Sequence, residues 1–504
     1  MLARVHSFAI DGVETRRVTV EADVRLGLPA FNVVGLADKS VREARERVRG
    51  AIQNTGFEFP QKRITVNLAP AYLRKEGPHF DLPLAIAVLA ASGQIASEAL
   101  EDCAFIGELS MYGLVSPVRG SLAVAEGARR AGLRRLMLPA SRAAEGALVE
   151  GIEALGVESL AHAVAVLRDE APPIASAPVA EREAVDDPVD LADVRGHDGL
   201  IGVIEIAAAG GHNLFMHGPP GTGKTMLARR LPTLLPPLTR EEAVEVTRIH
   251  SIAGLHSGGG LITERPFRAP HHLVSPSALV GGGATPKPGE ITLAHRGVLF
   301  LDELSEFNRN TLEALRQPLE DGRVVVVRAQ RVLTFPTRAM LVAASNPCPC
   351  GLGDPGCRCS AAERSRHERR LSGPLLDRID LTVHVPRPSA AALRGQGSPS
   401  SAAIRERVVA ARARQTARLA GTQATCNAHM TPAMLRELAA VTASARRALF
   451  ERHDAEGLTA RGHHRVLRVA RTVADLDGSA RVGSEHIHTA LAVRSDMSPT
   501  AVAA

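Results

Sequence analysis

The stretch HGPPGTGKTMLARRL, residues 217–231, decides the fold of this chain. Residues 218–225 have the spacing Gly-x-x-x-x-Gly-Lys-Thr, in which a glycine-rich loop turns its backbone N–H groups toward phosphate oxygens. The largely apolar residues 213–216 predict a strand before the loop, and residues 225–231 predict a helix that Pro232 ends. A glycine-rich turn without a ligand would need neither flank. Strand, loop and helix together predict an α/β fold that binds a nucleoside triphosphate.

This loop and the acidic end of a second strand form the predicted ATP and Mg²⁺ site. Lys224 can reach the β- and γ-phosphates, and Thr225 can hold Mg²⁺. Residues 297–304, GVLFLDEL, predict an apolar strand that ends in two acids. There Asp302 can hold Mg²⁺ through water, and Glu303 can deprotonate the attacking water. The loop residues expected to bind ATP are Gly218, Pro219, Pro220, Gly221, Thr222, Gly223, Lys224 and Thr225.

Two further residues follow predicted core segments and complete the expected catalytic set. Asn346 ends the apolar run AMLVAASN and can hold the attacking water or the γ-phosphate, although an ordinary strand-end Asn is the alternative. Arg378 lies in SGPLLDRID, where it can reach the γ-phosphate bound by a neighbouring subunit. The alternative is a surface Arg paired with Asp377 or Asp380. If Arg378 acts on a neighbour, the protein forms a ring.

Two segments outside these strands are expected to border the nucleotide. Arg461 lies near the start of a predicted helix in residues 458–476, where it can contact phosphates of its own subunit, and Arg465 one turn later is the rival. Val194 and Gly196 precede the first predicted core helix and are expected beside the adenine.

Together these motifs resemble the AAA+ ATPases, and within them the magnesium chelatase-like branch. Residues 265–283, RPFRAPHHLVSPSALVGGG, are similar to the insertion of that branch, and residues 322–336 predict its β-hairpin. In ring helicases of this branch both elements point into the central pore. The resemblance therefore implies that Arg328 and Arg331, at the hairpin tip, touch a DNA backbone. A solvated turn is the alternative for both.

The amino-terminal part resembles the Lon-type protease domain, on the stretches that begin at Lys75 and at Gly113. The protease has a Ser nucleophile shortly after its Gly-Pro pair, whereas here the Gly-Pro pair is followed by His79. The helix that supplies the activating Lys reads Gly-Ser-Leu-Ala at residues 120–123. Because a Ser–Lys pair needs both groups, we expect a proteolytically inactive relative.

Nearly the whole chain is similar to the ComM/YifB family, on stretches such as FRAPHH and LVAASNPCPCG. The resemblance implies a homohexameric ATPase that moves on single-stranded or branched DNA and promotes branch migration during transformation. The alternative is a motor of the chelatase type that remodels a protein partner without nucleic acid. A protease is disfavoured by the missing Ser and Lys. The expected fold is α/β, with a Lon-protease-like α+β N-terminal domain, a P-loop AAA+ core with a parallel sheet, and a C-terminal helical lid.

Composition supports this organisation without deciding it. Residues 171–190 and 387–401 predict linkers, so the expected domains are 1–170, 191–386 and 402–495. No apolar run reaches membrane length and no secretory signal begins the chain, so we expect a cytoplasmic protein without a membrane partner. A net charge of +6 over 504 residues is compatible with nucleic acid but weak. With 3% aromatic residues and no Trp, base stacking is not the expected mode of recognition.

Four of the six cysteines are clustered, at Cys348, Cys350, Cys357 and Cys359. In a reducing compartment such clusters are more often metal sites than disulfide sets, and four thiolates suit structural Zn²⁺. Free thiols and redox pairing are the alternatives. We expect Cys103 and Cys426 to be packing residues.

Overall fold

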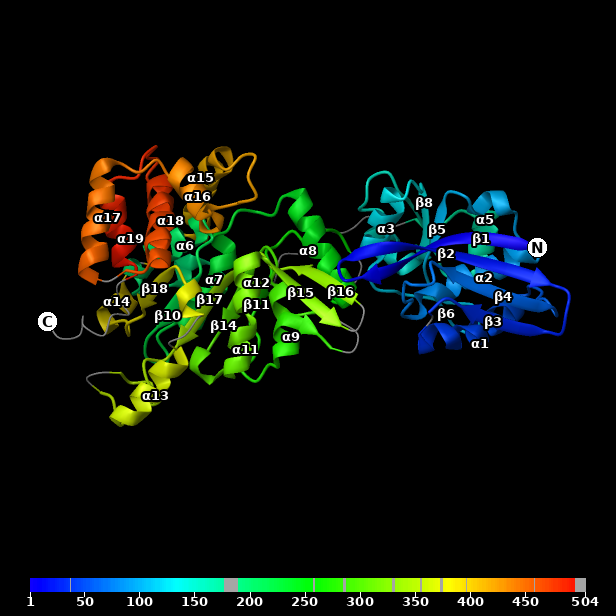
Figure 1. Cartoon of the computed structure of the whole chain (residues 1–504), viewed down its shortest axis with the longest axis horizontal. Helices are drawn as coiled ribbons and strands as arrows, with labels where there is room; N and C mark the ends of the chain where they lie inside the picture. Colours follow the sequence, from blue (N-terminus) through cyan, green and yellow to red (C-terminus); the bar gives the residue numbers. More distant parts are fainter. Residues whose placement is uncertain are drawn as a thin grey trace. The chain divides into compact units, whose positions relative to one another are not determined.

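The computed structural model describes residues 1–36, 38–175, 189–256, 259–283, 287–328, 331–353, 356–371, 375–395, 397–456 and 458–494. It divides into two compact units (Figure 1). Unit 1 comprises Met1–Ala184 and Arg240–Ile262, and unit 2 comprises Val185–Thr239 and Thr263–Ala504. Most of the predicted linker 171–190 lies outside the described residues.

Unit 1 is built on a seven-stranded mixed sheet, in the order β3-β4-β2-β1-β5-β8-β9. Its first two strands form the antiparallel pair that alternating apolar residues predict, with Leu2 opposite Asp23. β6 and β7 form a separate pair. The described strands of the unit are β1 Leu2–Asp11, β2 Glu14–Arg25, β3 Ala30–Val34, β4 Arg63–Ala69, β5 Cys103–Phe105, β6 Glu108–Leu109, β7 Val115–Ser116, β8 Arg135–Pro139 and β9 Glu153–Val157. The helices are α1 Lys39–Asn54, α2 Asp81–Ala91, α3 Ser121–Arg130, α4 Ala143–Gly146, α5 Leu160–Leu167 and α8 Arg240–Ala253.

Helix α2 lies at the centre of the hydrophobic core of unit 1. All eleven of its residues are buried, because the segment DLPLAIAVLAA is apolar on every face and packs between the sheet and α1. Its one acid, Asp81, is neutralised by Arg47, whose Nε lies 2.6 Å from Oδ2. Desolvation nevertheless raises the pKa of Asp81 to about 6, against the hydrogen bond from Arg47.

Helix α8 belongs to unit 1, although the chain enters it from unit 2 and returns to unit 2 after it. The sequence analysis places this segment inside the ATPase core. Its Arg248 forms an ion pair of 3.0 Å with Glu126 of α3. The buried carboxylate of Glu145 accepts hydrogen bonds from the Ser251 hydroxyl and from the backbone N–H of Leu122, the latter at 2.9 Å. A charged group buried in unit 1 therefore fixes this helix.

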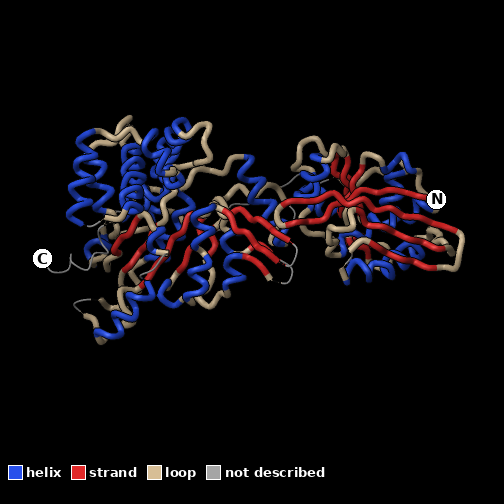
Figure 2. Tube along the Cα trace, viewed as in Figure 1, coloured by secondary structure: helices blue, strands red, loops and turns tan. Residues whose placement is uncertain are grey.

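Unit 2 contains a parallel sheet in the order β11-β14-β17-β10-β18, with all four strand pairs parallel. Figure 2 shows these strands with helices beside them. The strands of the unit are β10 Leu214–His217, β11 Phe267–Arg268, β12 Gly281–Gly282, β13 Lys287–Pro288, β14 Val298–Leu301, β15 Arg323–Arg328, β16 Arg331–Pro336, β17 Met340–Ser345 and β18 Leu381–His384. The helices beside them are α6 Asp198–Gly210, α7 Lys224–Leu234, α9 Pro276–Val280, α10 Glu290–Leu293, α11 Arg309–Ala314, α12 Arg316–Asp321, α13 Ala361–Leu371 and α14 Ala390–Arg394.

The carboxy-terminal part is helical, as predicted. Its helices are α15 Ser401–Arg418, α16 Pro432–Leu438, α17 Ala443–Glu456, α18 Ala460–Leu476 and α19 Ser484–Ala492. We call this group the lid. Buried apolar side chains run without a break from strand residues such as Met216 and Phe300 to Val466 and Val469 on α18. The lid and the sheet therefore share one core.

Two details of unit 2 differ from the predictions or refine them. Pro232 does not end α7, which continues to Leu234. The helix ends two residues after the proline, whose missing N–H removes one hydrogen bond, to the carbonyl of the residue four positions earlier. The predicted hairpin is confirmed as β15 and β16, paired antiparallel from Arg323 opposite Pro336 to Arg328 opposite Arg331. Ala329 and Gln330 at its tip lie outside the described residues.

The buried carboxylate under α8 gives a test of this arrangement. We expect Glu145→Ala to weaken the docking of α8 by about 3 kcal/mol, because the substitution leaves buried donors without their acceptor. Glu150→Ala is the matched control, since Glu150 pairs with Arg240 of the same helix but both side chains are exposed. Hydrogen exchange of the α8 amides measures the difference. Equal protection in both variants would show that Glu145 does not hold α8.

Candidate active site

The phosphate-binding loop joins β10 to α7. Gly218 is fixed by close approach, because a Cβ there would lie 2.2 Å from the carbonyl oxygen of Val385. Gly223 caps α7 with a φ of 89°, in the left-handed region that favours glycine. Two glycines of the motif therefore serve different purposes, and both shape the loop at the amino terminus of a helix, where anions bind.

The ammonium group of Lys224 lies inside this loop. Its Nζ donates to the carbonyl oxygens of Gly218 at 2.7 Å and Pro219 at 2.8 Å, and lies 3.3 Å from Oδ1 of Asn346. Burial lowers the pKa of Lys224, although the charge of Asp302 acts in the opposite direction. The strands β10 and β17 thus bring the lysine and Asn346 together, and this donor set fits phosphate oxygens.

The Mg²⁺-binding candidates also meet. The hydroxyl of Thr225 donates to Oδ2 of Asp302 at 2.7 Å. A hydroxyl beside a carboxylate is the oxygen pair that Mg²⁺ takes in loops of this kind. The next residue, Glu303, has a φ of 52°, a strained conformation for a residue with a side chain. Its carboxylate is half-exposed, so water can reach it.

One residue beside Glu303 was missed by the sequence analysis. Nδ1 of His272 lies 3.4 Å from Oε2 of Glu303, and the two form an ion pair when the imidazole is protonated. The register of two strands explains why the two residues meet. Arg268 on β11 lies opposite Leu299 on β14, and His272 and Glu303 each follow four residues later. The insertion that carries His272 therefore reaches the proposed catalytic acid.

The segment before α6 borders the phosphate loop. His197 is buried, and its Nε2 lies 3.5 Å from the position of a Cβ on Gly223. The carbonyl of Val194 accepts hydrogen bonds from the backbone and hydroxyl of Ser398. Gly196 has a φ of 75° and packs against Pro388. Residues of the predicted linker 387–401 thus hold this segment, although no contact shows where an adenine would lie.

The three arginine candidates have different surroundings. The guanidinium of Arg378 is largely buried and pairs with Glu320 of α12, a partner that the sequence did not indicate. Arg461 is exposed on the first turn of α18. Arg465 is buried, and burial lowers its pKa to about 10, together with the charge of Arg494. The structure describes no side-chain surroundings for Arg328 and Arg331, which stay predictions.

The four clustered cysteines converge. Their sulfur atoms all lie within 4.8 Å of one another, and the measured Sγ–Sγ distances are 3.3, 3.6 and 3.9 Å. A tetrahedral site with Zn–S bonds of about 2.3 Å needs Sγ–Sγ distances of about 3.8 Å. A disulfide would need about 2.0 Å, so the arrangement fits a metal better than a cross-link.

The two positions compared with the catalytic Ser and Lys of Lon-type proteases, at His79 and at residues 120–123, both lie in unit 1. Nε2 of His79 lies 3.1 Å from the carbonyl oxygen of Phe8, to which it donates. Burial lowers the pKa of His79 to about 4, so the ring is neutral at neutral pH. Ser121 is buried at the start of α3. Neither position carries a lysine.

Comparisons with known proteins agree with this geometry. A family model described as "Magnesium chelatase, subunit ChlI" matches residues 190–393. Models of subunit ChlI of Mg-chelatase and of the ChlI carboxy-terminal part match residues 20–142 and 398–494. Competence protein ComM of Haemophilus influenzae is 42% identical over 501 residues, which cover 98% of this chain and 97% of ComM.

The chain belongs to the ComM/YifB family of magnesium chelatase-like AAA+ proteins. YifB of Escherichia coli, described as uncharacterized, is 42% identical over 503 residues, covering 98% of this chain and 97% of YifB. Lon protease of Chloroflexus aurantiacus is 31% identical over 130 residues, or 24% of this chain and 15% of that protease. The expected fold class is therefore confirmed, and membership of the AAA+ proteins implies hydrolysis of ATP with Mg²⁺.

Two substitutions separate binding from hydrolysis at this site. We expect Lys224→Ala to abolish ATP binding, because the loop loses its only ammonium group. Glu303→Gln should keep binding and lower the hydrolysis rate roughly 100-fold or more, since the amide cannot accept a proton from water. Nucleotide binding and phosphate release are measured on the same preparations. Parental turnover in Glu303→Gln would remove this residue from catalysis.

Proposed function

We propose that this ComM/YifB-family protein is a homohexameric, ATP-driven motor that acts on single-stranded or branched DNA and promotes branch migration. The observation that carries the proposal is the full-length likeness to a protein named for competence, in a chain whose nucleotide-site candidates converge at one sheet edge. Competence requires that incoming strands be joined to a chromosome. A motor that moves a branch point would serve that step.

Each residue of the site has a role in this proposal. The loop from Gly218 to Thr225 and the segment at Val194 and Gly196 bind ATP, with Lys224 on the phosphates. Thr225 and Asp302 hold Mg²⁺, which neutralises charge on the phosphates when bound. Glu303 takes a proton from the attacking water, and Asn346 orients that water. Arg461, exposed on the lid, contacts the nucleotide when the lid closes; Arg465, its rival, is buried in the lid.

Arg378 acts on the ATP of a neighbouring copy, which makes the ring necessary for turnover. Its pairing with Glu320 supports this role, because the carboxylate holds the guanidinium in one place before a neighbour docks. The alternative is a surface Arg paired with Asp377 or Asp380; the observed partner is Glu320. Release from Glu320 then becomes part of ring assembly.

The β15–β16 hairpin carries Arg328 and Arg331 to DNA. The two six-residue strands place Arg328 opposite Arg331, and these arginines add two positive charges. The net charge of +6 is modest, so these local contacts supply the attraction. We place the protein in the cytoplasm, where the chromosome lies. Among the described helices, none combines the length and apolarity that a membrane crossing requires.

A second candidate is a motor of the chelatase type that remodels a protein partner without nucleic acid. The match of three ChlI models, covering the front, the core and the lid, favours it. Such a motor would hydrolyse ATP at a rate that DNA does not change. The two candidates share the ATP site and differ in what the hairpin touches.

The four-cysteine cluster holds structural Zn²⁺ in this proposal. It follows directly after Asn346, so the metal would stiffen the chain between β17 and α13. The thiolates supply charge that neutralises the ion, and folding and metal binding are then linked.

Branch migration tests the proposed function. On a labelled three-strand junction the parent should displace the strand only with ATP. Arg328→Ala combined with Arg331→Ala should lose displacement and DNA affinity while basal hydrolysis survives, with a salt dependence reduced by about one to two ions. Arg446→Ala with Arg447→Ala, on the exposed face of α17, removes the same charge as a control. If both double variants behave like the parent, the hairpin does not bind DNA.

Zinc gives a separate prediction. Protein purified without added metal should contain about one Zn²⁺ per chain, and Cys348→Ser with Cys357→Ser should lower this content. Cys103→Ala, in a buried strand outside the cluster, should leave it unchanged. Elemental analysis that finds no zinc in reduced, folded protein would leave the four thiols free.

A further inference from the structure

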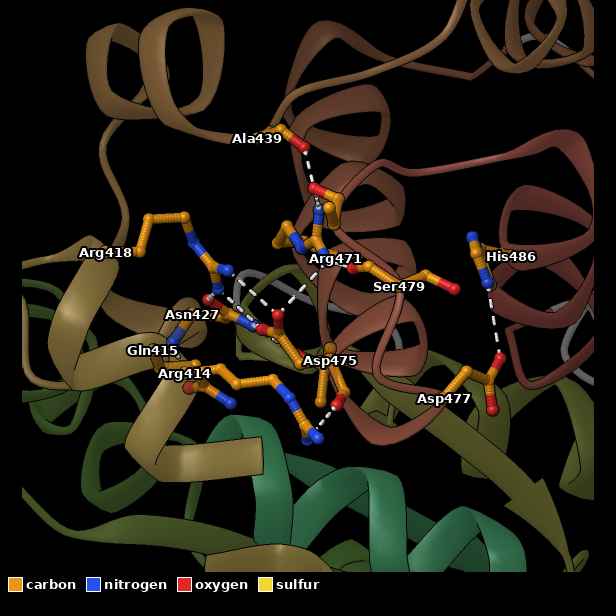
Figure 3. A network of polar contacts seen from close by, with 12 residues as sticks. Arg414, Gln415, Arg418, Asn427, Ala439, Arg471, Asp475, Asp477, Ser479 and His486 are labelled. Carbon is orange, nitrogen blue, oxygen red and sulfur yellow. Dashed lines mark hydrogen bonds and ion pairs between the residues drawn. The ribbon is translucent and has the colours of Figure 1, made fainter. Parts of the chain in front are cut away.

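A buried polar cluster stabilises the lid (Figure 3). The carboxylate of Asp475 on α18 accepts from the Arg418 guanidinium at 2.8 and 2.5 Å and from Nδ2 of Asn427 at 2.8 Å. Arg471, one turn earlier, pairs with it at 3.1 Å. Asp475 is almost inaccessible to solvent, so its charge depends on these partners. They tie α15, the 3-10 turn η7 (Asn427–His429) and α18 into one body.

Arg471 extends this body to the neighbouring loops. Its side chain is fully buried and donates to the carbonyl oxygens of Ala439 at 3.2 Å, Ala480 at 3.1 Å and Ser479 at 2.5 Å. These carbonyls lie before α17 and after α18. The cluster therefore moves with the lid as a rigid block, because each buried partner would be left unsatisfied if the block deformed.

The cluster reaches the ATPase sheet through a hydroxyl. Nδ2 of Asn427 also donates to Oγ1 of Thr472 at 3.0 Å, and that hydroxyl donates to the carbonyl of Arg468 at 3.1 Å. Nε2 of His212 lies 2.8 Å from the same hydroxyl oxygen. The Thr472 hydroxyl therefore joins Asn427 of the cluster to the His212 imidazole.

The second ring nitrogen of His212 lies near a buried carboxylate. Nδ1 of His212 lies 3.4 Å from Oδ2 of Asp380. The imidazole of His212 therefore lies between the Thr472 hydroxyl and the Asp380 carboxylate, with one ring nitrogen close to each. Gly210 makes room for it, because a Cβ there would lie 2.1 Å from Nε2 of His212 and 2.6 Å from the Thr472 hydroxyl.

Asp380 connects this contact to the segment of Arg378. The backbone N–H of Asn213 donates to Oδ2 of Asp380 at 3.3 Å, and Nδ2 of Asn213 donates to the carbonyl of Arg378 at 2.9 Å. Oδ1 of Asn213 accepts from the N–H of Leu341 on β17 at 2.9 Å. One amide thus holds the 3-10 turn η6 (Leu376–Arg378) against the strand that ends before Asn346.

We propose that His212 is a positioning residue that couples the lid of one subunit to its Arg378, and through Arg378 to the ATP site of the neighbouring subunit. The inference rests on the proposed ring. Hydrogen bonds and one close imidazole–carboxylate contact connect Asp475 to the carbonyl of Arg378, by way of the backbone and side chain of Asn213. The two side chains in the middle, His212 and Thr472, are fully buried. A lid that moves with its own nucleotide therefore moves the arginine that serves the next one, which passes the state of one site around the ring.

Mixed rings test this assignment. Breaking the relay with His212→Ala should lower kcat roughly 100-fold, as expected for a displaced catalytic group, while ATP affinity is unchanged. Thr472→Val should have the same effect without removing the imidazole, and Thr472→Ser, which keeps the hydroxyl, should behave like the parent. Each relay variant is then mixed with Glu303→Gln, which keeps ATP binding, and, separately, with Arg378→Ala.

The pattern of recovery decides the result. Mixing with Glu303→Gln should restore turnover, because that subunit binds ATP and supplies a well-placed Arg378 to the intact loop beside it. Mixing with Arg378→Ala should restore none, since no subunit then offers a usable arginine. The reverse pattern, or recovery in neither mixture, would overturn the proposal. A mixture of Glu303→Gln with Arg378→Ala is the reference: if it stays inactive, the proposed ring fails first and the relay with it.

Discussion

The hydrogen bond between the Thr225 hydroxyl and the Asp302 carboxylate is the contact on which the site depends. It joins the first turn of α7 to the end of β14, so the phosphate loop and the acidic strand cannot separate without losing it. The parallel register then fixes the rest. With β14 in place, β17 brings Asn346 to Lys224, and β11 aims the insertion at Glu303. A single edge of one sheet thus collects groups that are more than a hundred residues apart.

The sheet that carries this edge is also connected to the lid. The lid shares the core of the sheet and reaches η6 through His212, Asp380 and Asn213. The amino-terminal unit holds α8, a segment that the chain inserts between the phosphate-loop helix and the hairpin. In the proposed motor, movement of the lid in one subunit affects the ATP site of the neighbouring subunit through these contacts.

The sequence predicts those features that local spacing determines. The loop, the acidic strand and Asn346 each follow an apolar run, so their meeting at one sheet edge follows from a parallel sheet, and the alternation of residues 322–336 gives the hairpin. Features set by distant partners are not predictable in this way. Glu320, which holds Arg378, His272 beside Glu303, and the placement of α8 depend on pairings between distant segments. Pro232 predicts the end of α7 only approximately, because the helix continues to Leu234.

In the proposed motor, the ATP cycle acts on DNA. The rate of ATP hydrolysis, measured at low salt against rising concentrations of single-stranded DNA, tests it most directly, since both candidate functions share the site and differ only in this response. A DNA motor predicts a rate that rises and saturates, with an effect that added salt weakens. A rate that stays the same at every DNA concentration would contradict the account and favour a motor that remodels protein.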